Sequence, residues 1–306
     1  ILNPAAHGGR TGALKAELAA AFAAKGLSAT FESTRAPGES TGRLAALEPG
    51  DFDVVVSAGG DGTLFEVVNG LMALPEDRRP ALGVLPLGTG NAFARDLGLE
   101  PGDWRGAMEP LVAGHRCGVD VGEVDGEGQR FWFINMLGLG FVEDAAQQAK
   151  KLKWLGRSAY TLGALVRLLR MPSYDLDVRL DGAPLPGGDQ SGQGQSLFFL
   201  EVANSRFTGT RFLMAPDARL DDGLFDVVVV RSLSMLRALR LFPTIYDGSH
   251  LAEPEVEVQR ALEVEISARS PIGGLIVVGE FYGALPIAIR CRPAALQGVG
   301  RLHSAH

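Results

Sequence analysis

"SAGGDGTLFEVVNGL", residues 57–71, places glycines, an aspartate and a threonine directly after a β-branched segment. DFDVVVS at 51–57 predicts a buried strand, and the apolar residues of 63–74 recur at helical spacing. Residues 59–63 therefore predict a tight turn from a strand into a helix. Glycines there let a ligand approach the backbone, and N–H groups at a helix N-terminus favour an anion. The carboxylate of Asp61 would repel a bare phosphate. A Mg²⁺ ion between the two groups would explain an acid at this position. We infer a nucleotide-phosphate site.

A second glycine-rich turn follows the next strand. ALGVLP at 81–86 predicts that strand, and LGTGN at 87–91 opens another helical segment. Thr89 and Asn91 have side chains that can donate hydrogen bonds to phosphate or ribose oxygens. A simple helix-capping turn is the alternative interpretation of this stretch, and it stays open.

The first third of the chain alternates strands and helices. Besides the elements above, we expect a helix at 12–26 that ends at Gly26, a strand at 27–34 and a short helix at 40–50. This alternation predicts a parallel sheet covered by helices on both faces, with ligands bound beyond the carboxyl ends of its strands. Both glycine-rich turns lie at that edge.

The pattern changes near residue 116, where short strands separated by turn residues begin. They predict an antiparallel, sandwich-like domain, interrupted by helical stretches at 143–170 and 234–248 and by a polar loop at 186–195. With 306 residues, two domains are expected: an α/β domain at 1–115, to which residues 292–306 return, and a β-rich domain at 116–291.

Composition limits the partners and the location. The net charge of −7 argues against general nucleic-acid binding. Cys117 and Cys291 lie in strand-like segments and are expected to be reduced core residues of an intracellular protein. No apolar run is long enough to cross a bilayer, so we expect a cytoplasmic protein whose membrane contact is peripheral. The chain begins with ILNP inside a strand-like segment, so further residues are expected to precede it.

One stretch indicates where that membrane contact lies. KKLKWLGRSAYTLGALVRLLR at 150–170 combines six basic residues with apolar ones and contains no acid. It is typical of an amphipathic helix on an anionic membrane surface. A solvated amphipathic helix is the other interpretation. The oligomeric state stays open, with a homodimer as one option.

Other motifs are weaker or absent. The chain has neither a P-loop GK[ST] nor a GxSxG motif, and its histidines lack metal-site spacing. DARLDDGLFDV at 217–227 is either a solvated hairpin loop or a site for a hard cation. VVGEFYGALP at 277–286 places Glu280 on a tight turn between strands.

Together these motifs resemble the diacylglycerol kinase catalytic family, which includes bacterial lipid kinases and sphingosine kinases. The resemblance begins with Asn3–Pro4 and spans nearly the whole chain. The segments that carry it are GGDGT, LPLGTGN, FINMLGLGF, GRSAYTLGAL, APDARLDDGLFDVVVV and GEFYGALPIAIRCRPAAL. It implies an ATP-binding α/β domain followed by a β-sandwich-like domain, with the active site in the cleft between them.

The resemblance also implies roles for individual residues. Asp61 would help to hold the Mg²⁺ of Mg-ATP, and Glu280 matches the general base that accepts the proton of the lipid hydroxyl. A structural Mg²⁺ site would use the Asp222 carboxylate and the backbone carbonyls of Arg219 and Leu224. The nucleotide site would be lined by Asn3, Thr34, Gly59, Gly60, Asp61, Gly62, Thr63 and Thr89.

Three positions depart from the family pattern. Gly279 replaces the aspartate of DGE before the base, Ala92 replaces the acid after GTGN, and His7 stands where the first turn has glycine. The GTGNA form also resembles the sphingosine kinase branch. The expected activity is ATP-dependent phosphorylation of a membrane lipid such as diacylglycerol. A sphingoid-base kinase, a soluble-substrate kinase of the NAD kinase type and a non-catalytic nucleotide- or lipid-binding regulator are the alternatives.

Overall fold

The structure is a computed structural model. It describes residues 1–4, 9–88, 90–140, 173–187, 195–209, 211–269, 275–277 and 280–302; of residues 10, 140, 275–277 and 280–282 it describes the backbone only. The predicted helix at 143–170, with the basic stretch 150–170, lies outside the described residues. So do most of the 186–195 loop, His7, Thr89 and Gly279.

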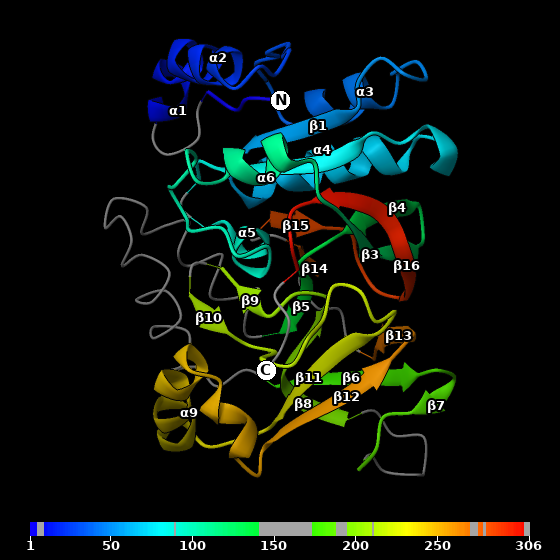
Figure 1. The fold of residues 1–306 in the computed structure, drawn as a ribbon. Coiled ribbons are helices and arrows are strands. Elements are labelled where there is room, and N and C mark those ends of the chain that lie inside the picture. Colours follow the sequence, from blue (N-terminus) through cyan, green and yellow to red (C-terminus); the bar gives the residue numbers. More distant parts are fainter. Residues whose placement is uncertain are drawn as a thin grey trace.

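The first part of the chain is an α/β arrangement (Figure 1). Strands β1 (Val54–Gly59) and β2 (Ala81–Pro86) are parallel, in a register that pairs Val54 with Ala81 and Gly59 with Pro86. Helix α4 (Asp61–Met72) connects them and buries Val67, Val68 and Leu71. The other helices here are α1 (Arg10–Ala13), α2 (Lys15–Ala24), α3 (Glu39–Leu44), the 3₁₀ helix η2 (Glu76–Arg78), α5 (Ala92–Asp96) and α6 (Met108–Ala113).

The rest of the chain is mainly antiparallel strands. They are β3 (Arg116–Gly126), β4 (Gln129–Phe133), β5 (Met136–Gly140), β6 (Tyr174–Leu180), β7 (Ala183–Pro184), β8 (Gln195–Ala203), β9 (Phe207–Thr208), β10 (Phe212–Leu213), β11 (Phe225–Arg231), β12 (Val256–Ala261), β13 (Glu263–Ala268), β14 (Leu275–Val277), β15 (Glu280–Tyr282) and β16 (Ile287–Val299). Helix α9 (Met235–Leu241) and the 3₁₀ helices η4 (Phe242–Tyr246) and η5 (Ser249–Ala252) lie between β11 and β12. The predicted fold class, an α/β domain followed by a β-sandwich-like domain, is confirmed.

One strand connects the two parts of the chain. β16 is antiparallel to β3 from Ile287 to Val299 and to β13 at its beginning, and near its end Gly298 pairs with Leu82 of β2 in parallel. The sheet is therefore continuous from β1 to β15 within the described residues. Figure 1 shows β16 between the helices around β1 and the β-rich part. The boundary that we predict near residue 115 stays a prediction.

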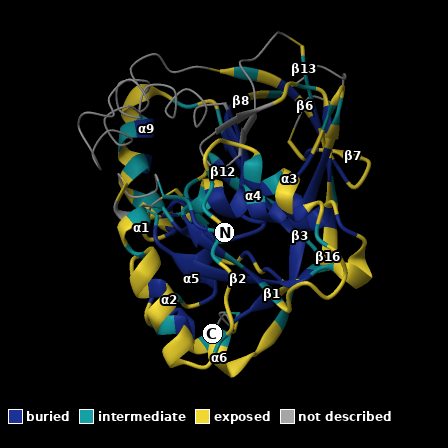
Figure 2. Cartoon of the chain, turned by 90° about the horizontal axis from the view of Figure 1, so that it is seen from above, coloured by how far each residue is buried: buried dark blue, intermediate teal, exposed yellow. Residues whose placement is uncertain are grey.

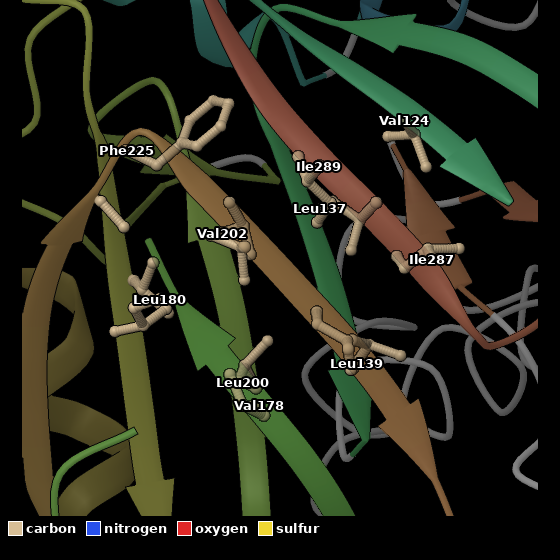
Figure 3. Close-up of a cluster of buried hydrophobic side chains, with 14 of the residues drawn as sticks. Val124, Leu137, Leu139, Val178, Leu180, Leu200, Val202, Phe225, Ile287 and Ile289 are labelled. Atoms are coloured by element: carbon tan, nitrogen blue, oxygen red, sulfur yellow. The ribbon is translucent and has the colours of Figure 1, made fainter. Parts of the chain in front are cut away.

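The largest hydrophobic core lies in the β-rich part. Alternating residues of β5, β8, β11 and β16, among them Leu137, Leu200, Phe225 and Ile289, point into one cluster (Figure 3). Phe65 of α4 belongs to the same cluster, with its ring centroid 6.1 Å from that of Phe131. Figure 2 shows the central strands as buried and the outer faces of α2 and α6 as exposed. The α/β part and the β-rich part therefore share apolar contacts as well as a sheet.

Both cysteines lie in strands, as the sequence predicts. Neither is bonded to another cysteine; Cys291 is buried and Cys117 half-buried. Burial raises the pKa of the Cys291 thiol to about 12. This thiol is therefore a core group rather than a reactive one.

Some predicted boundaries were wrong. Residues 27–34 form only an isolated bridge, Leu2 with Ser33, because the neighbouring segment soon reaches Pro4, which has no N–H group to donate. The helix expected at 12–26 is divided at Leu14 into α1 and α2, and the helix expected at 40–50 is α3, which begins at Glu39 and ends at Leu44.

Three further features of the β-rich part are not visible in local patterns. The apolar stretch 130–140 is divided at residues 134–135 into β4 and β5. β16 continues past Pro293 through a register shift between Arg292 and Leu296, as β-bulges allow. The helix expected at 234–248 is α-helical only to Leu241; η4, with Pro243 in its first turn, follows.

Candidate active site

The two glycine-rich turns leave the sheet side by side. β1 and β2 are parallel neighbours, and their last residues, Gly59 and Pro86, are paired. The turn after β2 bends back onto the turn after β1, because the Gly88 N–H donates to the Gly59 carbonyl at 2.8 Å. Both turns therefore lie at the carboxyl edge of the parallel strands, where open α/β sheets bind ligands.

Close packing requires glycine at several of these positions. A Cβ on Gly88 would lie 2.8 Å from the Gly60 nitrogen, and a Cβ on Gly59 would lie 2.7 Å from the Thr63 Cβ. Gly62 is different, because it is exposed and a Cβ there would meet no atom of the described residues within 4 Å. Packing therefore explains why positions 59 and 88 are occupied by glycine. It does not explain Gly62, which is exposed in the first turn of α4.

Asp61 lies where the turn becomes the helix. It is the first residue of α4, whose N-cap is Gly60, so no side chain caps the N–H groups of the first turn. Its Oδ1 accepts the Ala92 N–H at 2.9 Å and the Asn135 side-chain amide at 3.3 Å. Its Oδ2 lies against Gly90, where a Cβ would overlap it. Three segments of the chain thus surround this carboxylate.

The surroundings of Asp61 also change its protonation. Burial raises the pKa of its carboxyl to about 6, against the lowering effects of the Ala92 N–H and the Asn135 amide. A cation at this position would favour the ionised form, because opposite charge lowers a carboxyl pKa. The hydrogen bonds to Oδ1 are therefore compatible with a carboxylate whose other oxygen binds a metal ion.

Other predicted nucleotide residues lie at the same edge. The Asn3 N–H donates to the Ala58 carbonyl at 3.2 Å, one residue before Gly59. The Thr34 N–H donates to the Leu2 carbonyl at 2.9 Å, which places Thr34 beside the first segment of the chain. Thr63 is buried in the first turn of α4. The structure therefore places Asn3, Thr34 and Gly59–Thr63 close together.

Backbone pairing locates Glu280 relative to these turns. Glu280 is the first residue of β15 and pairs with Val277 of β14, which pairs in turn with Leu137 of β5. Adjacent strands are about 4.8 Å apart, so the Cα of Glu280 lies roughly 10 Å from that of Leu137. Leu137 follows two residues after Asn135, whose amide contacts Asp61. The predicted base thus lies on the part of the sheet that borders the predicted phosphate site.

The predicted structural metal site has its carboxylate already occupied. Arg219, Asp222 and Leu224 lie in the segment before β11, where Asp222 Oδ1 accepts the Leu224 N–H at 3.1 Å and Oδ2 forms an ion pair with Arg260. No group of three or more His, Cys, Asp or Glu side chains is arranged for a metal in the described part of the chain. The magnesium site at Asp222 therefore stays a prediction.

Asp120 is a site neighbour to which sequence reasoning gave no role. Its carboxylate accepts the Gly223 N–H at 2.6 Å and the Ala294 N–H at 2.7 Å, and its own N–H donates to the Leu220 carbonyl. Burial raises the pKa of this carboxyl, and the two N–H donors oppose that rise. Asp120 therefore fixes the acidic turn against β16.

Asn135 is a second residue near the candidate site to which sequence reasoning gave no role. It is 3% exposed and lies between β4 and β5. The signal in the sequence is a single amide side chain inside the apolar run FINMLGLGF. Its contact with Asp61 joins residues 74 positions apart, which no local pattern reveals.

Within the described part of the chain, none of the helices combines the length and apolar character needed to cross a bilayer.

Comparison with known proteins shows which protein family the chain resembles. Residues 1–124 match the diacylglycerol kinase catalytic domain, and residues 136–299 match the YegS C-terminal NAD kinase beta sandwich-like domain. The chain is 31% identical to a diacylglycerol kinase of Bacillus subtilis (strain 168) over 267 residues, which are 87% of this chain and 83% of that protein. It is 33% identical to the diacylglycerol kinase of Staphylococcus carnosus (strain TM300), with 85% and 81% covered.

Solved structures agree on the fold. The crystal structure of a diacylglycerol kinase from Bacillus anthracis str. Sterne superimposes with a TM-score of 0.76 at 24% identity, covering 98% of this chain and 95% of that one. An NAD kinase from Archaeoglobus fulgidus is more distant, with a TM-score of 0.50 at 12% identity. From the matched catalytic domain and the coverage of its relatives, the chain belongs to the diacylglycerol kinase family and is a lipid kinase.

Proposed function

We propose that this lipid kinase transfers the γ-phosphate of Mg-ATP to the hydroxyl group of a membrane lipid such as diacylglycerol. The observation that carries the proposal is the contact between the two glycine-rich turns at the carboxyl edge of β1 and β2, with the Asp61 carboxylate held between them. Membership of the diacylglycerol kinase family supports both the donor and the acceptor.

The first turn of α4 supplies the phosphate contacts in this proposal. α4 is 12 residues long, and its N-cap is a glycine, so its leading N–H groups can donate hydrogen bonds to an anion. The open space over Gly62 admits a phosphate group to that turn. Phosphoryl transfer depends chiefly on such positioning and charge stabilisation.

Asp61 is the residue that would hold the metal ion. Its Oδ1 already accepts two hydrogen bonds, and one carboxylate can accept more, so Oδ2 is the oxygen that we assign to the ion. Bound there, Mg²⁺ would neutralise part of the charge on the phosphates.

Glu280 is the proposed base. As the lipid oxygen forms its bond to the γ-phosphorus and the bond to the leaving ADP oxygen breaks, the hydroxyl proton passes to the Glu280 carboxylate. A positioned base contributes about 10²–10⁴-fold to such reactions. We also propose that the chain meets its substrate by peripheral contact with the membrane, with the predicted basic stretch at 150–170 as the contact element.

Labelled ATP with a total lipid extract tests the proposal. We expect one labelled lipid, identified against diacylglycerol, sphingoid-base and phosphatidylglycerol standards. A labelled soluble metabolite with no labelled lipid would contradict the acceptor class. Mg-ATP binding without transfer to any lipid would favour a regulator instead.

Two variants test the assigned roles. Glu280→Gln is expected to bind Mg-ATP normally and to lose turnover by at least about 10²-fold. Glu265→Gln, an exposed glutamate of β13 that pairs with Arg179, is the matched control and should retain full activity. Near-normal turnover of Glu280→Gln would remove Glu280 from the mechanism.

A further inference from the structure

Asn135 connects the β-rich part of the chain to Asp61. Its backbone carbonyl accepts the N–H groups of Asn204 at 2.9 Å and Ser205 at 3.0 Å, at the end of β8. The side chain of Asn204 donates to the carbonyls of Asp120 at 2.9 Å and Ile134 at 2.8 Å. The backbone around Asn135 is therefore fixed from one side, while its side-chain amide reaches Asp61 Oδ1 on the other.

The orientation of the Asn135 amide follows from its neighbour. An ionised carboxylate only accepts hydrogen bonds, so the NH₂ group must face Asp61 and the Oδ1 atom must face away. That Oδ1 atom is buried and has no hydrogen-bond partner among the described residues. Leaving a buried acceptor unsatisfied destabilises a fold, whereas an apolar side chain of similar shape does not. Stability alone does not explain an asparagine here.

We propose that Asn135 is a positioning residue for phosphoryl transfer: from the β-rich part of the chain it holds Asp61 Oδ1 and so presents Oδ2 to the magnesium ion of the nucleotide. This inference rests on the proposed function. The Ala92 N–H and the Asn135 amide hold the same oxygen, at 2.9 and 3.3 Å. The Asn135 amide adds a donor from the β-rich part to the backbone donors, and so restricts the orientation of the carboxylate further.

The proposal separates stability from ligand binding. Asn135→Leu keeps a similar side-chain volume and removes both the donor and the unsatisfied oxygen, so its Tm is expected to be equal to or above that of the wild type. Its affinity for ATP in the presence of Mg²⁺ is expected to fall about tenfold, the effect of losing one hydrogen bond to a charged group. Its affinity for ATP in EDTA should stay within about twofold.

Calorimetric titration with ATP, with and without Mg²⁺, measures these changes together with the Tm. The magnesium effect is the ratio of the ATP affinity with Mg²⁺ to the ATP affinity in EDTA. Asn135→Ala should lose this effect to the same extent as Asn135→Leu, because both variants lack the side-chain donor. Asn204→Ala is the structural comparator: it removes two hydrogen bonds from the same junction but none from Asp61, so it should lower the Tm and keep the magnesium effect.

Three results would overturn the proposal: an unchanged magnesium effect in both Asn135 variants, an equal loss in Asn204→Ala, or a lowered Tm of Asn135→Leu with unchanged Mg-ATP affinity. The binding measurements need no lipid. If the wild type phosphorylated no lipid but the Asn135 variants lost the magnesium effect, the proposed acceptor would fail while the role of Asn135 stood.

Discussion

Substitution of Gly62 by alanine tests whether a phosphate group lies on the first turn of α4. In the part of the chain that the structure describes, the added methyl group would meet no atom within 4 Å, and Gly62 is not among the residues with positive φ. The substitution is therefore not expected to destabilise the fold. Within a helix, alanine is favoured over glycine by about 0.5–1 kcal/mol, so Gly62→Ala should be at least as stable as the wild type.

The expected loss is in nucleotide affinity. A methyl group over the leading N–H groups of α4 keeps a phosphate oxygen from their hydrogen-bonding distance. One hydrogen bond to a charged group is worth about 1.5–3 kcal/mol, which corresponds to a loss of roughly 10–100-fold in affinity. Gly62→Ala should thus combine a retained Tm with much weaker Mg-ATP binding.

Calorimetric titration with Mg-ATP and a thermal melt of each variant provide the assay. Gly42→Ala in α3 is the matched control, because that glycine is also exposed and its Cβ would also meet nothing within 4 Å. It should gain similar stability and bind Mg-ATP as the wild type does. If Gly62→Ala bound Mg-ATP with unchanged affinity, the phosphate could not lie against this turn, and the assignment of the site would be wrong.

Three further predictions concern stability and reactivity. Asn69 exchanges hydrogen bonds with the backbone of Trp132 at 2.8 and 2.9 Å, so Asn69→Ala should lower the free energy of unfolding by about 1–3 kcal/mol in a denaturant titration. Burial raises the pKa of Glu201 from 4.5 to about 7, so the folded state holds its proton more tightly and loses stability as pH rises from about 4.5 to about 7. The Tm of Glu201→Gln relative to the wild type should therefore increase over that range; a constant difference would contradict the assigned pKa. Cys291, whose thiol is buried, should resist alkylation at pH 8 in the native protein and react after unfolding.

The sequence predicted the elements that depend on local pattern. The strand, glycine turn and helix at 51–74 are present because β-branched residues, glycines and helical spacing each favour the same local structure. The fold class followed from the change from alternating elements to short strands near residue 116. The candidate residues Asn3, Thr34, Gly59, Asp61 and Thr63 were also brought together, since the carboxyl ends of parallel strands share one edge.

Features that depend on distant contacts could not be predicted. The edge strand β12 was missed because the alternation of Val256 and Val258 with polar residues is short and ends at Gln259–Arg260. Asn135 was not assigned a role because its partners, Asp61 and residues 204–205, are far away in the sequence. The contact of Gly88 with Gly60 could not be predicted from the sequence for the same reason. Local patterns indicated the candidate site, whereas the orientation of its side chains depends on long-range hydrogen bonds.

The path of β16 limits how this protein can be divided. Although residues 1–124 and 136–299 match two family domains separately, the strand that ends the second match is paired along most of its length with β3, most of which lies in the first match. A gene cut between the matches would leave two fragments with open strand edges, each exposing unpaired backbone groups prone to self-association. Swapping either half with that of a relative would therefore require the exchange of β3, β4 and β16 as a set. We therefore expect that the two matched segments of this chain do not fold as separate units.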